Sequence, residues 1–332
     1  MYNKLKELSE SCFIGNINDT AEIVTRMIKP FVDEVYLDKS GGVIAKINGK
    51  NDYRIMLEAH IDEIGMIVTK VLSGGFVRVR NVGGVDIRVL PSLKVVIHGK
   101  TAVKGIFTST PPHLASQNND DKYPSFDDIM IDTGLENAEE IISVGDFVTF
   151  DTKFTQLNED YVTGKSLDNR TGCLSLIRAA EMIHNNGTPE NTIVFSFATA
   201  EELGNRGSKI ASYDIDANEA IAVDVSFGLS PNAPKEHCGV LGDGAMIGVS
   251  PILSRAVKDK LISIAENNNI DYQLEIMGGR TSTDADVISI TKSGVKTGLL
   301  SIPLRYMHTP VEVAKLSDIE SVAMLLKEYA LS

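Results

Sequence analysis

The chain has 332 residues, of which 43% are hydrophobic and 23% are charged. That length is enough for about two domains, and the composition is typical of a globular protein. The formal net charge of −13 argues against nucleic-acid binding, which needs a basic surface. No apolar run reaches the roughly 20 residues of a membrane span, and the first residues lack the apolar core of a signal peptide. We therefore expect a cytoplasmic protein that binds neither nucleic acid nor membrane.

The N-terminal part predicts helices followed by strands. Two helices and three strands are expected from the hydrophobic periodicity and the capping residues, over residues 2–13, 18–29, 32–36, 43–47 and 54–60. Asn48-Gly49 is a dipeptide typical of tight turns, and it predicts a hairpin between the last two strands.

The middle of the chain, residues 67–161, has a different hydrophobic pattern, with little helical periodicity. Short alternating runs at 75–80, 93–98, 102–107 and 147–150 are separated by Gly-Gly, Pro and Asp clusters. This pattern predicts a small all-β barrel or sandwich. Because strand–helix alternation resumes afterwards, the segment is interpreted as a domain inserted into an α/β domain made of residues 1–66 and 162–332.

The remaining residues predict an α/β domain with a mixed, mostly parallel sheet flanked by helices. The strand at 192–200 is rich in β-branched and aromatic residues, which is typical of a strand buried on both faces. The other expected elements are strands and helices at 171–184, 220–224, 254–267, 272–277, 284–291, 297–302 and 313–331.

Two carboxylates, Glu201 and Glu202, directly follow the strand at 192–200. A charge at the end of a buried strand costs free energy unless a cation or a proton compensates it. Parallel sheets also bind their ligands beyond the carboxyl ends of their strands. Polar residues at apolar strand ends or glycine turns form the candidate site: His60, Asp62, Asp168, Glu201, Glu202, Asp224 and His308.

Imidazoles and carboxylates are ligands that suit zinc, cobalt or manganese. Two histidines and three acids can hold two ions if one carboxylate bridges them, and paired ions activate a water. Asp62 is a candidate to orient His60, and Glu201 is a candidate general base. Taken alone, Asp168 also suits a helix cap and Asp224 a turn, so only the arrangement favours the metal site.

Five sequence blocks resemble the M42 family of dinuclear metallo-aminopeptidases. They are HIDEIG at 60–65, GKSLDNRTG at 164–172, EELGNRG at 201–207, the strand end at Asp224 and RYMHTP at 305–310. The blocks follow the order of the family and span nearly the whole chain. The family includes glutamyl aminopeptidases and the tetrahedral TET peptidases, and some members carry the label cellulase M or endoglucanase.

The resemblance implies roles for the candidate residues and a cofactor of two divalent ions per subunit, zinc foremost, with cobalt and manganese as alternatives. It implies a metal-dependent aminopeptidase that hydrolyses the N-terminal bond of short peptides through a water bridging the two ions. One ion is then held by His60 and Asp224, the second by Glu202 and His308, with Asp168 bridging both, Glu201 as general base and Asp62 orienting His60.

The resemblance also implies an assembly. The inserted domain is similar to the PDZ-like barrel through which family members form dimers, and in many members the dimers build a hollow dodecamer. A homo-oligomer of dimers, or of dimers assembled into a dodecamer, is therefore expected.

The preference for the first residue of the peptide stays open. The segment GGRTSTDA at 278–285 is longer than the Gly-Gly-Thr-Asp-Ala of many relatives, and candidate substrate-binding residues are Arg280, Thr283, Asp284 and Arg305. Arg280 favours an acidic first residue, as in glutamyl aminopeptidases.

Two other functions were weighed against the aminopeptidase. One is a dinuclear carboxypeptidase or N-acyl-amino-acid deacylase of the M20 type, which usually carries a helix–sheet insertion. The other is an endoglucanase, which needs paired carboxylates and usually aromatic platforms, whereas this chain has no tryptophan.

Overall fold

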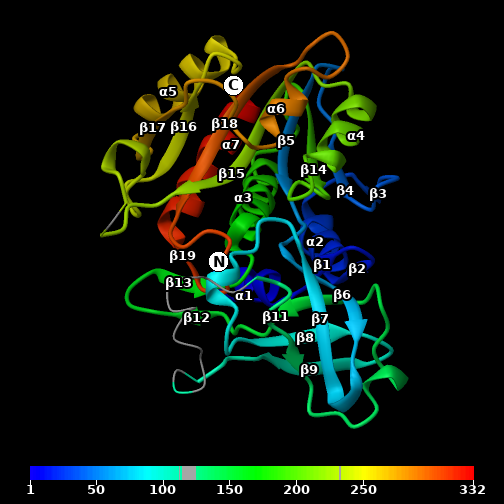
Figure 1. The fold of residues 1–332 in the computed structure, drawn as a ribbon. Helices are drawn as coiled ribbons and strands as arrows, with labels where there is room; N and C mark the ends of the chain where they lie inside the picture. The colour runs from blue at the N-terminus through cyan, green and yellow to red at the C-terminus, as the bar shows by residue number, and fades with distance from the viewer. Residues whose placement is uncertain (112, 114–124, 232) are drawn as a thin grey trace.

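The computed structural model describes residues 1–111, 113, 125–231 and 233–332. Its strands form an eight-stranded sheet, a closed six-stranded barrel and two small sheets. Figure 1 shows the helices around the large sheet and the barrel at one end of the molecule. In the described part of the chain, no helix combines the length and the apolar character needed to cross a membrane.

The large sheet is mixed and has the order β17-β16-β18-β15-β5-β14-β4-β3. Its strands are β3 Glu34–Leu37, β4 Val43–Ile47, β5 Arg54–His60, β14 Thr192–Ala198, β15 Glu219–Phe227, β16 Ala245–Val249, β17 Tyr272–Ile276 and β18 Lys296–Leu304. The central strands β14, β5, β15 and β18 pair in parallel, as do β16 and β17. The pairs β16–β18, β14–β4 and β3–β4 are antiparallel.

The hairpin predicted at Asn48-Gly49 is wrong. Strand β14 lies between β4 and β5, and Ile193 pairs with Ile47 on one side and Ile55 on the other. The turn dipeptide is a local signal, whereas β14 is uncharged, mostly apolar and buried at every position. Pairing β14 on both edges therefore satisfies its backbone and buries its side chains on both faces.

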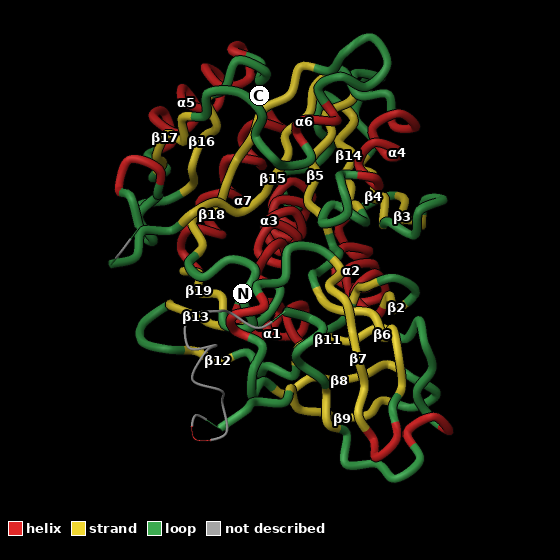
Figure 2. The backbone as a smooth tube through the Cα atoms, viewed as in Figure 1, coloured by secondary structure: helices red, strands yellow, loops and turns green. Residues whose placement is uncertain are grey.

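Helices cover both faces of this sheet. They are α1 Tyr2–Glu10, α2 Asp19–Ile28, α3 Leu167–His184, α4 Arg206–Ile215, α5 Arg255–Asn268, α6 Ala285–Ile288 and α7 Leu316–Leu331, and Figure 2 shows α3 and α7 behind the strands. One core joins α1, α2, α3, α5 and α7 to Phe195 and Phe197, and a second joins α4 and α6 to Val194. The alternation along β14 confirms a strand buried on both faces.

The final helix begins later than predicted. Residues Glu312–Lys315 form strand β19, which pairs with β13 Tyr161–Gly164 in a three-stranded sheet with β12 Thr155–Gln156. Helix α7 then starts at Leu316. The sequence EVAK at 312–315 fits neither the two-residue period of a strand nor the 3.6-residue period of a helix. It becomes a strand because it pairs with β13, about 150 residues earlier, and hydrophobic periodicity does not predict such a long-range contact.

The middle of the chain forms the predicted all-β unit. The closed barrel contains β6 Gly65–Val71, β7 Phe76–Val82, β8 Lys94–His98, β9 Ala102–Phe107, β10 Ile131–Asp132 and β11 Phe147–Phe150. Its interior is a separate apolar cluster that includes Met66, Val79, Ile97 and Val148. Strands β1 Phe13–Ile14 and β2 Ile17–Asn18 form the remaining small sheet. The domain limits at residues 67 and 161 and the PDZ-like character of the barrel stay predictions.

Candidate active site

The candidate residues meet at the carboxyl ends of the parallel strands. His60 ends β5 and pairs in register with Ala198, the last residue of β14, so Glu201 and Glu202 leave the sheet beside it. Asp224 lies in the neighbouring strand β15. Since parallel strands end at one edge of the sheet, residues far apart in the sequence converge there.

Asp168, at the start of α3, is the centre of the cluster. Its Oδ1 lies 3.0 Å from His60 Nε2, and its Oδ2 lies 3.3 Å from His308 Nε2. His308 Nε2 is also 3.3 Å from Glu202 Oε1, and His60 Nε2 is 3.7 Å from Asp224 Oδ1. Each oxygen of the Asp168 carboxylate therefore faces a different histidine.

These distances define two groups that share one carboxylate. In the group of His60, Asp168 and Asp224, and in the group of Asp168, Glu202 and His308, one ligand atom from each residue lies within 4.8 Å of the others. Imidazole nitrogen with carboxylate oxygen is the donor set of zinc and similar ions. Each group therefore has the donor set to hold a divalent cation, and Asp168 is common to both.

Asp62 supports the cluster from the side of β5. Its Oδ1 lies 3.5 Å from His60 Nδ1, the ring nitrogen that faces away from Asp168. Its two oxygens also accept hydrogen bonds from the backbone amides of Glu201 and Glu202, at 3.0 and 3.2 Å. Asp62 therefore holds the turn that carries the two glutamates and lies beside the imidazole ring of His60.

Glu201 points into the same cluster without belonging to either group. Its Oε2 lies 4.0 Å from His60 Nε2, and its Oε1 accepts a hydrogen bond of 2.9 Å from Asn205 Nδ2. Asn205 also donates to Asp284 Oδ1, at 3.0 Å. Sequence reasoning missed Asn205, although its place four residues after Glu201 was a usable signal.

The electrostatics of the cluster are those of a cation site. Within the residues that the structure describes, the acids of the two groups form ion pairs only with His60 and His308. Burial raises the pKa of Asp224 to about 7 and that of Glu201 to about 9. Hydrogen bonds to Asp168 and Glu202 raise the pKa of His308 to about 11. Asp224 and Glu201 hold protons more tightly than usual because no lysine or arginine of the described residues compensates their charge. Asp168 differs: burial acts to raise its pKa, but the hydrogen bonds from His308 and His60 bring it below its usual range.

Glu312 is a second residue that sequence reasoning missed. This buried side chain accepts hydrogen bonds from the backbone amides of His308, at 2.9 Å, and Asp168, at 3.1 Å. It joins the start of α3, which carries Asp168, to the turn that carries His308. The hydrogen bond between Asp168 and Glu312 joins residues 144 positions apart, and the local sequence does not predict it.

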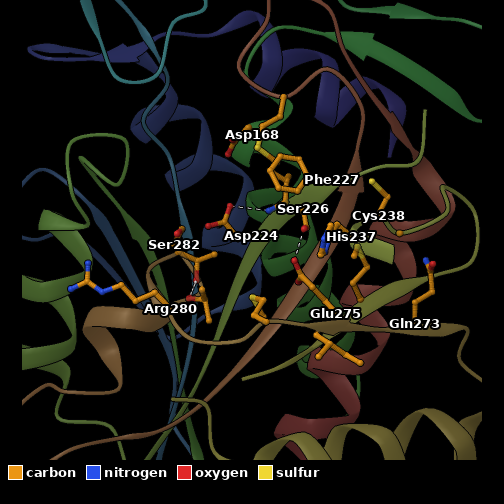
Figure 3. A pocket seen from close by; sticks show the side chains of 18 of the residues that line it. Asp168, Asp224, Ser226, Phe227, His237, Cys238, Gln273, Glu275, Arg280 and Ser282 are labelled. Carbon is orange, nitrogen blue, oxygen red and sulfur yellow. Dashed lines mark hydrogen bonds between the residues drawn. The ribbon is translucent and has the colours of Figure 1, made fainter. Parts of the chain in front are cut away.

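A cavity of about 470 Å³ opens beside the cluster (Figure 3). Of the predicted substrate-binding residues, Arg280 and Thr283 line it. Asp284 is buried and holds Asn205. Arg305 instead donates to the backbone carbonyl of Leu229, at 2.7 Å. The cavity places an open volume against Glu201 and the two metal-site groups, as a substrate pocket requires.

Comparison with known proteins places this geometry in a family. The sequence profile of the M42 glutamyl aminopeptidase family matches residues 41–325. A lysyl aminopeptidase of Pyrococcus furiosus is 33% identical over 92% of this chain and 89% of its own length. A TET1 peptidase structure from Pyrococcus horikoshii, described as assembling into a tetrahedron or a large octahedral shell, has 33% identity and a TM-score of 0.87 over 99% of both chains.

A Thermotoga maritima structure titled endoglucanase also shares the fold, with 28% identity and a TM-score of 0.79 over 98% of this chain and 96% of its own. The family match covers most of the chain and includes every residue of the cluster built above. The chain belongs to the M42 peptidase family and is a hydrolase.

Proposed function

We propose that the chain is a metal-dependent aminopeptidase that removes the first residue from short peptides. The observation that carries the proposal is the shared carboxylate of Asp168, whose two oxygens face His60 and His308 at 3.0 and 3.3 Å. A bridging acid between two histidine–carboxylate groups is what a pair of divalent ions needs. The family match and the names of the relatives support peptide hydrolysis.

Two divalent ions in these groups, zinc foremost, with cobalt or manganese as alternatives, supply Lewis acidity at the first peptide carbonyl and activate a water when bound. The protein's own contribution to proton transfer is Glu201. It takes the proton of the attacking water and passes it to the leaving amine. Burial raises the pKa of Glu201 in the absence of ions, and bound cations would lower it, so that the carboxylate could accept the proton.

Neighbouring side chains position these groups. Asn205 holds Glu201 Oε1 at 2.9 Å, and Asp62 holds the amides of the Glu201-Glu202 turn. Glu312 ties the backbones of Asp168 and His308 together. Because these contacts come from different parts of the chain, the geometry depends on the folded protein rather than on any one motif.

We also propose that the protein works as a homo-oligomer. The TET1 peptidase of Pyrococcus horikoshii is described as assembling into a tetrahedron or a large octahedral shell, and the match covers 99% of both chains. The separate apolar core of the barrel suits a PDZ-like dimerisation domain comprising residues 67–161. Dimers, or a dodecamer built from them, in the cytoplasm are the states expected.

The M20-type deacylase or carboxypeptidase is the nearest competing function. It uses a similar pair of ions, but its substrate has a blocked amine or is attacked at the other end. The inserted unit here is a closed barrel, not a helix–sheet lid. An endoglucanase needs two carboxylates free to flank a sugar, whereas Asp168, Asp224 and Glu202 each lie beside a histidine.

The decisive experiment compares aminoacyl p-nitroanilides with a free amine and their N-acetylated forms, using the metal-loaded protein. We expect hydrolysis of the free-amine forms only. In Glu201→Gln we expect turnover to fall roughly 1,000-fold, the scale of general-base catalysis, while the metal content stays unchanged.

The matched control is Glu139→Gln, because Glu139 also begins a pair of adjacent glutamates but is exposed on the barrel. This variant should keep normal activity. Cleavage of the acetylated substrates alone would favour the deacylase, and near-normal turnover of Glu201→Gln would remove Glu201 from the mechanism.

A further inference from the structure

The wall of the substrate cavity contains an acid that the mechanism does not use. Glu275, on strand β17, lines the cavity together with Glu201 and Asp224. Its Oε1 accepts a hydrogen bond from Ser226 Oγ, and its Oε2 accepts one from Ser301 Oγ at 2.6 Å. Figure 3 shows the Ser226 hydroxyl and the Glu275 carboxylate directed toward one another.

The two serines tie Glu275 to the catalytic edge of the sheet. Ser301 on β18 is the direct pairing partner of Asp224 on β15, and Ser226 is the second residue after Asp224. Both serines are buried. The carboxylate is therefore held in a fixed place beside the metal-site residues rather than on a mobile surface side chain.

The charge of Glu275 is not matched by a fixed cation. In the described ranges, neither lysine nor arginine forms an ion pair with it, and its donors are neutral hydroxyls. Burial raises its pKa, and the two serine hydrogen bonds oppose that rise. A desolvated carboxylate in this state gains most from an incoming cation.

Part of the cavity wall suits a long apolar stem. Met246, Leu274 and Met277 line the cavity around Glu275. A lysine or arginine side chain has an aliphatic stem and a charged end, so it can cover apolar surface while its charge reaches a carboxylate. An uncharged side chain would leave the charge of Glu275 without a cation, with only the two serine hydroxyls as hydrogen-bond donors.

We infer that Glu275 makes this enzyme select peptides whose first residue is lysine or arginine. The inference rests on the proposed aminopeptidase function and names its substrate class. Glu275 acts as a specificity residue: it pairs with the cationic side chain of the first residue and repels an acidic one.

The cationic residue in the same wall, Arg280, does not reverse this preference. Its side chain is exposed, and in Figure 3 it extends away from Ser226 and Glu275. An acidic first residue in the cavity would lie beside the half-buried carboxylate of Glu275, whereas the guanidinium of Arg280 is solvated. The expectation of an acidic preference from Arg280 and the inference from Glu275 therefore make opposite predictions for one substrate panel.

The test measures kcat/KM of the metal-loaded enzyme on lysyl, norleucyl and glutamyl p-nitroanilides. Norleucine has the stem of lysine without its ammonium group, so the lysyl/norleucyl ratio isolates the charge. We expect lysyl to exceed norleucyl roughly 100-fold, because a site built for a charged partner rejects the analogue that lacks it. A ratio near one, or faster cleavage of the glutamyl substrate, would overturn the inference even if Glu275 variants fail to fold.

The matching variant is Glu275→Gln, which keeps the shape and an acceptor for the serines. Its lysyl rate should fall roughly 100-fold, mainly through KM, while the norleucyl rate stays within about threefold. The control is Glu266→Gln, since Glu266 is exposed and contacts the same strand through Tyr272. It should leave all rates unchanged.

Two further outcomes distinguish a failure of the proposed specificity from a failure of the proposed aminopeptidase function. If Glu275→Gln lowers all rates equally, Glu275 binds the α-amine that every substrate shares, and the inference about the side chain is wrong. If the metal-loaded protein cleaves none of the three free-amine substrates, the proposed aminopeptidase function fails and the inference fails with it.

Discussion

Two groups of buried charged residues lie close together in this protein, one around Glu63 and one around Asp168, and they differ in the cations that face their acids. Glu63 forms an ion pair with Lys165 at 2.6 Å and lies 3.8 Å from Arg170. Three residues earlier, His60 belongs to the cluster around Asp168, where the acids pair only with histidines among the described residues. One cluster brings its own fixed cations, and the other does not.

The difference appears in the titration of the acids. Burial acts to raise the pKa of Glu63, but Lys165 and Arg170 bring it below its usual range. In the other cluster, burial raises the pKa of Asp224 to about 7 and that of Glu201 to about 9. The comparison shows that burial of an acid alone does not indicate a functional site. Several buried acids that lie beside imidazoles, without lysine or arginine partners, are the stronger indication of one.

The substitution expected to have the largest effect on metal content and turnover is Asp168→Asn, which changes the residue common to both groups. In Asp168→Asn the two groups lose their common charge, so we expect both ions to leave and turnover to fall by at least roughly 100-fold. Elemental analysis of the purified variant, beside the rate on a free-amine p-nitroanilide, checks this. Normal metal content would show that Asp168 does not hold the ions.

The complementary change breaks the other cluster. Lys165→Met leaves Glu63 buried without its nearest cation, and we expect a loss of about 3–5 kcal/mol in the free energy of unfolding. The control Lys50→Met removes an exposed pair with Glu190 and should cost about 0–1 kcal/mol. Urea unfolding measures both, and metal content in the folded fraction should stay normal. Loss of metal without loss of stability would mean that the two clusters are not separate.

The smallest effect is the pH dependence of metal binding. Among the proposed ligands, the pKa of Asp224 is about 7 and that of His308 about 11. Bound ions require these groups without protons, so binding releases protons at pH 7 and the affinity rises with pH. We expect roughly a tenfold gain per pH unit for each proton displaced. Chelated protein titrated with zinc at pH 6, 7 and 8 checks the sign.

The sequence predicted the cluster because its residues follow a simple rule. His60, Glu202 and Asp224 come at or near the ends of apolar strands, and parallel pairing brings those ends together. The barrel was also predictable, since alternating runs and turn residues are local signals. Both features therefore need little knowledge of the tertiary structure.

The missed features depend on partners that are distant in the sequence. Glu312 binds the amide of Asp168, 144 residues away, and β14 inserts between β4 and β5 in place of the hairpin at Asn48-Gly49. The sequence around Glu275 gives no sign of a special role, because its contact with Ser301 and its place in the cavity wall are set by the folded structure. Such contacts follow from the assembled sheet, not from local periodicity or turn chemistry.

The most direct test of the central claim is a metal titration of the chelated protein that follows both occupancy and hydrolysis of a free-amine p-nitroanilide. Two groups that share Asp168 predict that activity is absent without metal and reaches its plateau when two ions are bound per chain. Full activity in the metal-free protein, or a plateau at one ion per chain, would contradict a dinuclear site.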